Sequence, residues 1–245
     1  MVFSFFSDFY YYSTFPEKKF IITVSLMYGL IAPSLIGFAV WFKAPQCLCQ
    51  SPDSEEYFRC FEKDFCNKNT DMTIKIDEIS SPSISATLGL LCGMKNSLLQ
   101  SYFLGGILGC LANIFLPIPA HKRKLALVFF GLIQAFANFS VVFTYESTRS
   151  LQLSFAAIAF SLMILHANCP LIINEAFVGD LAKAATSVLL MGWGVMGLIY
   201  VIFAYFNDAD FFRCFTFIGF INLANSLHLI FQNEPDVIEQ LAAKV

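Results

Sequence analysis

Long apolar runs dominate the chain and determine its predicted architecture. Crossing the hydrocarbon core of a bilayer takes about 20 consecutive apolar residues of helix. Stretches of this kind occupy residues 20–42, 97–116, 125–144, 151–173, 184–206 and 211–231. All are free of Asp, Glu, Lys and Arg, except that Arg213 stands near the start of the last one. Uninterrupted apolarity over such lengths favours helix over strand. The pattern therefore predicts an all-α membrane protein with six transmembrane helices.

Polar segments divide this pattern into three parts. Residues 1–19 are rich in Phe and Tyr, which suit the headgroup layer, so we expect a short interfacial segment there. Residues 20–231 form the predicted six-helix bundle, including a long loop over residues 43–96. Residues 232–245 form a polar carboxyl-terminal tail.

Composition narrows the class of protein. The chain is 57% apolar and 13% charged, whereas a soluble domain carries about 25% charged residues. This argues against a water-soluble enzyme, and the net charge of −3 offers no basic field for nucleic acid. With three His, no nucleophile–base or paired-carboxylate constellation is discernible. We therefore expect no catalytic residues, no cofactor and no bound metal.

Basic residues predict the orientation of the bundle. With the amino terminus inside, the inner segments contain Lys18, Lys19, Lys122, Arg123, Lys124, Lys183 and Lys244. The short outer loops then hold only Arg149 and Arg213. The positive-inside rule favours this arrangement, with both termini inside. Inside means the cytosol, or the matrix if the membrane is mitochondrial.

The 43–96 loop contains four of the chain's eight cysteines: Cys47, Cys49, Cys60 and Cys66. Cysteines on the oxidising side of a membrane are typical of disulfides. We expect two disulfides, in which the adjacent Cys47 and Cys49 have different partners. Free thiols and a zinc site are the alternatives, although the C-x-C-x10-C-x5-C spacing fits no structural zinc pattern.

Glycines at helical spacing predict close contacts between helices. Gly105 and Gly109 form a G-x-x-x-G pair, which lets helix backbones approach each other within one chain or between two. The segment from Gly192 to Gly197 matches the dinucleotide motif G-x-G-x-x-G literally. It lies in an apolar span with no preceding strand, so we interpret it as a packing surface.

Polar groups inside a membrane are expensive and are therefore candidates for function. The candidates for a transport path or gate are Gln134, Asn138, His166, Asn168, Glu175 and Arg213. Gln134 and Asn138 share one helix face, which we expect to look into the bundle. His166 and Asn168 face different directions and suit helix–helix hydrogen bonds. Glu175 lies near the inner interface, where water or Lys183 would satisfy its carboxylate.

Taken in order, these features resemble the amino-terminal half of a major facilitator superfamily transporter, in its organic cation and anion branch. Members of that branch have one span, a long cysteine-containing outer loop, and then five closely spaced spans. The matching elements are Pro45 and Cys47, Ser83-Ile84, Cys92, Gln100-Ser101, the Gly-rich 105–109, Glu175, Arg213 and Asn233-Glu234-Pro235. The resemblance implies half of a major-facilitator bundle, built as a 3+3 repeat.

The superfamily's signature loop between spans two and three is degenerate here. Its Gly-x3-Asp-Arg-x-Gly-Arg-Arg/Lys pattern aligns with Ile114, Ile118, Pro119, His121, Lys122 and Arg123. Only the terminal basic pair survives. Ile118 replaces the Asp, whose charge contacts stabilise one transport state in the family. The chain also supplies only one wall of a site that two bundles enclose in a transporter.

These departures lead to the functional expectation. We expect a transporter-derived subunit, in contact with the lipid bilayer and other membrane protein subunits, that has a structural or accessory role in a larger complex and no substrate. The alternative is a half-size organic-ion transporter that works as a dimer. The mitochondrial inner membrane and the plasma membrane are both open as its location.

Overall fold

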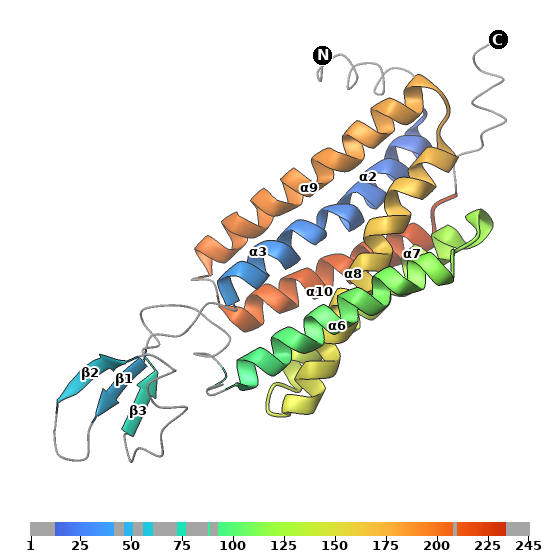
Figure 1. The fold of residues 1–245 in the computed structure, drawn as a ribbon. Helices are drawn as coiled ribbons and strands as arrows, with labels where there is room; N and C mark the ends of the chain where they lie inside the picture. Colours follow the sequence, from blue (N-terminus) through green and yellow to red (C-terminus); the bar gives the residue numbers. More distant parts are fainter. Residues whose placement is uncertain are drawn as a thin grey trace, which may run out of the picture.

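The computed structural model describes residues 13–41, 47–50, 56–60, 73–76, 88, 93–207 and 210–233. Within them the chain is mostly helical, as predicted. The helices are α2 (Phe15–Gly29), α3 (Ile31–Trp41), α6 (Met94–Phe115), α7 (Arg123–Phe143), α8 (Thr148–Ala176), α9 (Asp180–Phe206) and α10 (Phe211–Ile230), with a 3₁₀ turn, η1, at Ala120–Lys122. They form an elongated bundle with a small sheet near one end (Figure 1).

Four of the described helices are long and apolar enough to cross a membrane: Asn96–Phe115, Ala120–Phe143, Thr148–Ala176 and Asp180–Phe206. The predicted first span is divided at Leu30 into α2 and α3, each shorter than a bilayer-spanning helix. The predicted sixth span, α10, includes Arg213, Asn222, Asn225 and His228 among its 20 residues. The four central helices therefore support the predicted multi-pass membrane protein.

The first helix begins earlier than the apolar run indicates. Thr14 precedes it, and the Glu17 carboxylate accepts hydrogen bonds from the Thr14 backbone N–H (2.6 Å) and hydroxyl (2.9 Å). Pro16 lies in the first turn, where its missing N–H costs nothing. Residues 15–19 of the predicted interfacial segment are thus helical, because capping side chains extend a helix beyond its apolar part. Residues 1–12 lie outside the described residues.

Helix packing follows a definite pairing. α6 packs on α8, α2 packs on α9, and α7 packs on both α8 and α10. α3 continues the contact with α9, and α2 also meets α8 and α10. Two groups of buried apolar side chains hold the bundle together, one around Phe20, Leu165 and Ile173 and the other around Leu151, Phe155 and Phe215.

The predicted loop contains a three-stranded antiparallel sheet with strand order β2-β1-β3. Its strands are β1 (Cys47–Gln50), β2 (Tyr57–Cys60) and β3 (Thr73–Ile76). Alternation along β1 buries Cys47 and Cys49, and Cys49 forms a disulfide with Cys60 across the β1–β2 pair. One predicted disulfide is therefore present, and Cys66 lies outside the described residues.

The end of the bundle opposite the sheet gathers polar and basic groups. α2 begins, α6 ends, α7 begins and α10 ends there (Figure 1). The Gln232 side-chain amide donates to the Thr23 hydroxyl at 2.9 Å and to the Lys19 carbonyl at 3.4 Å, and Lys124 donates to the Gln232 carbonyl. These bonds fasten the start of α2 to the end of α10.

Candidate functional site

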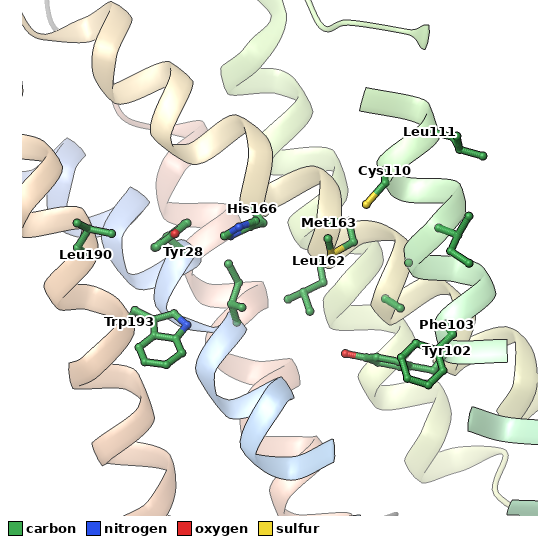
Figure 2. Close-up of a pocket in the computed structure, with 14 residues that line it drawn as sticks. Tyr28, Tyr102, Phe103, Cys110, Leu111, Leu162, Met163, His166, Leu190 and Trp193 are labelled. Atoms are coloured by element: carbon green, nitrogen blue, oxygen red, sulfur yellow. The ribbon is translucent and has the colours of Figure 1, made fainter. Parts of the chain in front are cut away.

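One face of the bundle is hollowed into a cavity of about 750 Å³. Its walls come from α2, the start of α3, α6, α8 and α9, whereas no residue of α7 or α10 lines it. Figure 2 shows side chains from these helices around the hollow. No Asp, Glu, Lys or Arg of the described residues lines the cavity, and most of its wall is apolar. The site can therefore hold an apolar body but offers no charge to a substrate.

Three of the polar side chains of the cavity, Tyr28, His166 and Trp193, lie on one side of it. Tyr28 of α2 and His166 of α8 stack with their ring centroids 5.4 Å apart and an angle of 15° between the ring planes. Trp193 of α9 lies beside them, and Tyr102 and Phe103 of α6 lie across the hollow (Figure 2). The expected helix–helix hydrogen bond of His166 is not found among the described residues, where its ring stacks on Tyr28. No signal in the sequence identified this partner, Tyr28, the last residue but one of α2.

Glu175 has a partner that was not predicted from the sequence. Its carboxylate forms an ion pair with the Arg123 guanidinium, which joins the end of α8 to the start of α7. Lys183, which was expected as a partner alongside water, instead forms an ion pair with Asp180 at 2.9 Å, three residues away in the first turn of α9. Proximity in sequence favours the latter pair, because the two side chains lie on adjacent turns of one helix.

The degenerate signature lies at the basic end of the bundle, away from the cavity. Ile114 is near the end of α6, Ile118 and Pro119 lie in the connection, and His121 and Lys122 belong to η1. Arg123 opens α7 and is the member of this segment that pairs with Glu175.

Asn168 does make the interhelical contact that its position predicts. Its side-chain amide donates to Asn113 Oδ1 of α6 at 3.0 Å and to the Ile164 carbonyl at 2.9 Å. Asn113 in turn donates to the carbonyls of Gly109 and Met163, both at 3.1 Å. Asn113 was missed, although an Asn within an apolar run is the signal that could have identified it.

Gln134 and Asn138 are buried in the bundle but do not line the cavity. They share a face of α7 with Gly131, which meets Ser226 of α10 and Met27 of α2. Asn138 donates to the Gln134 backbone carbonyl at 2.7 Å, while the Gln134 side-chain amide has no hydrogen-bond partner in the part of the chain that the structure describes. Both therefore belong to the seam between α7 and α10.

Arg213 lies at the sheet end of α10, where its guanidinium donates to Asn207 at 3.3 Å. The Asp210 carboxylate caps the same helix by accepting from the Arg213 backbone N–H at 2.8 Å. Arg213 therefore lies away from both the cavity and the Arg123–Glu175 pair.

The predicted packing glycines make contacts within the chain. A Cβ at Gly105 would lie 2.1 Å from the Ala156 carbonyl oxygen, and one at Gly109 would lie 2.7 Å from that of Phe160. A Cβ at Gly192 would lie 2.2 Å from the Ser25 carbonyl oxygen, and Gly197 faces Ala32 at 3.3 Å. The α6–α8 and α2–α9 crossings therefore both depend on residues without a side chain.

Comparison with protein-family models, with curated proteins and with solved structures finds no match. The resemblance to the major facilitator superfamily therefore stays a prediction from the residues quoted above.

Proposed function

We propose that the chain is a transporter-derived membrane subunit with a structural or accessory role in a larger membrane complex. The observation that carries this proposal is the one-sided cavity. α2, α3, α6, α8 and α9 surround it, while α7 and α10 close the bundle behind them. Such a hollow face is available to a partner, and it offers no charged group to an organic ion.

The pairing of the helices supports a half-transporter bundle of six spans. If α2/α3, α6 and α7 form one repeat and α8, α9 and α10 the other, exchanging the repeats converts the α2–α9 pair into the α8–α6 pair. Both pairs are tight crossings at glycines, Gly192 in one and Gly105 in the other. The third helices, α7 and α10, pack on each other. This is the relation expected of a 3+3 repeat.

The exposed surface supports docking on the hollow face. α6 and α9 flank the cavity, and they are the least buried of the four membrane-length helices. Their exposed side chains are large and apolar, including Phe103 and Ile107 on α6 and Leu190 and Leu198 on α9. A partner helix or lipid would cover them equally well, so the distinction needs an experiment.

The test compares two Leu→Lys substitutions. Leu111 lines the cavity and is 41% exposed, while Leu227 lies on α10, outside the cavity, and is 44% exposed. Leu111→Lys should release co-purifying subunits after mild detergent extraction, because a desolvated Lys is costly in an apolar interface. Leu227→Lys should retain them. Equal retention by both variants would argue against docking on the hollow face.

The Arg123–Glu175 pair favours the second candidate, a dimeric organic-ion transporter. A surviving basic residue of the signature loop pairs there with the acidic residue that ends the fourth span. If the chain is such a transporter, reconstituted protein should take up an organic ion saturably. Glu175→Gln should then abolish this uptake while the fold stays intact. If the chain has an accessory role, it should show no saturable uptake, and Glu175→Gln should change only stability or assembly.

A further inference from the structure

Three polar groups face the cavity without a hydrogen-bond partner among the described residues. They are the Tyr28 hydroxyl, the His166 imidazole and the Trp193 indole N–H, on three different helices. Tyr28 is 8% exposed, whereas Trp193 is 45% exposed and His166 is exposed too, so the latter two side chains are open to the hollow face. Polar groups left without partners in an apolar environment are unfavourable. Their gathering at one wall therefore indicates a group that a bound molecule would supply.

The rest of the cavity has the opposite character. Ile107 and Leu111 of α6 and Leu162 and Met163 of α8 belong to its apolar lining. A volume of about 750 Å³ lies in the range of small-molecule sites, which are mostly apolar with a few convergent polar groups. The lining thus has one wall with three hydrogen-bonding side chains, and the rest of it is mostly apolar, with the Tyr102 hydroxyl as a further polar group.

We propose that this cavity binds an uncharged, largely apolar molecule that carries hydroxyl or carbonyl groups at one end. The apolar body lies between α6 and α8, and the polar end reaches Tyr28, His166 and Trp193. Tyr28 and Trp193 donate hydrogen bonds, and His166 either donates or accepts. This proposal goes beyond the accessory role and needs only the cavity, so a ligand bound without any partner subunit would support it independently.

The lack of Asp, Glu, Lys and Arg among the described lining residues disfavours a charged ligand. An organic anion or cation would lose its hydration shell in the cavity, and no opposite charge among the lining residues would compensate. The aromatic rings at Tyr28, Tyr102 and Trp193 would give a cation some compensation through their π faces. A cationic competitor therefore belongs in the test.

The experiment uses the full chain in lipid nanodiscs and a photoreactive cholesterol analogue as the probe. Labelled peptides are identified by mass spectrometry, with unlabelled cholesterol, dioleoylglycerol or tetrapentylammonium as competitor. We expect saturable labelling of the segments of α6 and α8 that line the cavity. Competition by either neutral lipid would support the proposal, and the more potent competitor would identify the source as sterol or glyceride. Competition by tetrapentylammonium alone would overturn the proposal in favour of an organic ion.

A matched pair of glycine substitutions separates the cavity from the outer surface. Gly106 lines the cavity, and a Cβ there would have only ordinary contacts, with Met163 at 3.9 Å and Ala159 at 4.0 Å. Gly106→Leu therefore fills the hollow and should lower labelling about tenfold through overpacking against the ligand. Gly194 on α9 does not line the cavity and has nothing within 4 Å of its Cβ position. Gly194→Leu should label like the wild type, and equal labelling of both variants would place the probe on the lipid-facing surface and refute the proposal.

A second measurement tests the hydrogen-bonding wall. Cholestane lacks the hydroxyl of cholesterol, so the ratio of their competition constants reports the polar contact alone. His166→Leu should reduce the preference for cholesterol about fivefold, the equivalent of one hydrogen bond. Leu162→Ala changes the apolar wall and should weaken both competitors together. An unchanged ratio in His166→Leu and in Tyr28→Phe would show that this wall does not recognise the ligand and would overturn the assignment.

Discussion

At the scale of single residues, the bundle depends on backbone contacts that only glycine permits. The Gly192 position lies against the Ser25 backbone, and Gly29 on the partner helix lies against the Gly192 carbonyl, 2.3 Å from a Cβ built there. The α2–α9 crossing is therefore fixed by two glycines that face each other. Adding one methyl group at either position forces the helices apart, because protein interiors have little free space.

Gly192→Ala should lower the free energy of unfolding by about 1–3 kcal/mol, the usual cost of overpacking. Gly194→Ala is the matched control two residues away, where the new methyl group meets nothing within 4 Å. It should leave stability unchanged or raise it slightly, since Ala is the better helix former. Thermal unfolding of both purified variants in detergent measures the difference. Equal stabilities would contradict the backbone contact at Gly192.

At the scale of elements, apolar runs were sufficient to predict α6, α7, α8 and α9. Their boundaries match the predicted spans closely because an apolar run of bilayer length has one structural solution in lipid. The break at Leu30 was not predictable from hydropathy, since the residues on both sides are apolar. The sheet strands are four residues long, too short for a periodic signal.

The sequence indicated which polar residues need a partner, but not which residues those partners are. Asn168 was identified as an interhelical hydrogen-bonding group because a polar side chain in an apolar helix requires a partner. Arg123 was not predicted as a partner of Glu175, because the two are 52 residues apart and nothing in the sequence indicates that they lie close together in space. Tyr28 was missed for the same reason, since its role depends on His166 of another helix.

The α7–α10 seam contains the clearest element-scale prediction. Both polar atoms of the Gln134 side chain are buried without a hydrogen-bond partner among the described residues. Removing a buried group of this kind removes its desolvation penalty of about 1–3 kcal/mol, so Gln134→Leu should raise the free energy of unfolding by up to that amount. Asn138→Leu is the control, because it loses a 2.7 Å hydrogen bond to the Gln134 carbonyl and should not stabilise the protein. A loss of stability in Gln134→Leu would mean that the amide is satisfied in the folded protein.

At the scale of the whole molecule, the two ends of the bundle have different chemistry. One end has the disulfide-containing sheet, and the other has the Arg123–Glu175 pair together with Lys19 and Lys124. Basic residues favour the inner side of a membrane, and disulfides favour an oxidising compartment. The molecule therefore has the asymmetry expected of a protein oriented across a bilayer, with the sheet outside.

The number of spans decides where the two termini lie, and it gives the final prediction. The four membrane-length helices α6 to α9 run in alternate directions and begin and end at the sheet side (Figure 1). If they alone crossed the bilayer, the start of α2 and the end of α10 would both stay on that side. With α2/α3 and α10 crossing as well, both ends lie opposite the sheet, beside Lys124. We expect the six-span arrangement, because Gln232 at the end of α10 is hydrogen-bonded to Thr23 of α2 and to Lys124 of α7. Epitope tags at the two termini, digested by protease in sealed vesicles of known orientation, measure this directly. Both tags should be accessible from the inner side and protected from the outer side. Cleavage of both tags from the sheet side would establish four spans instead.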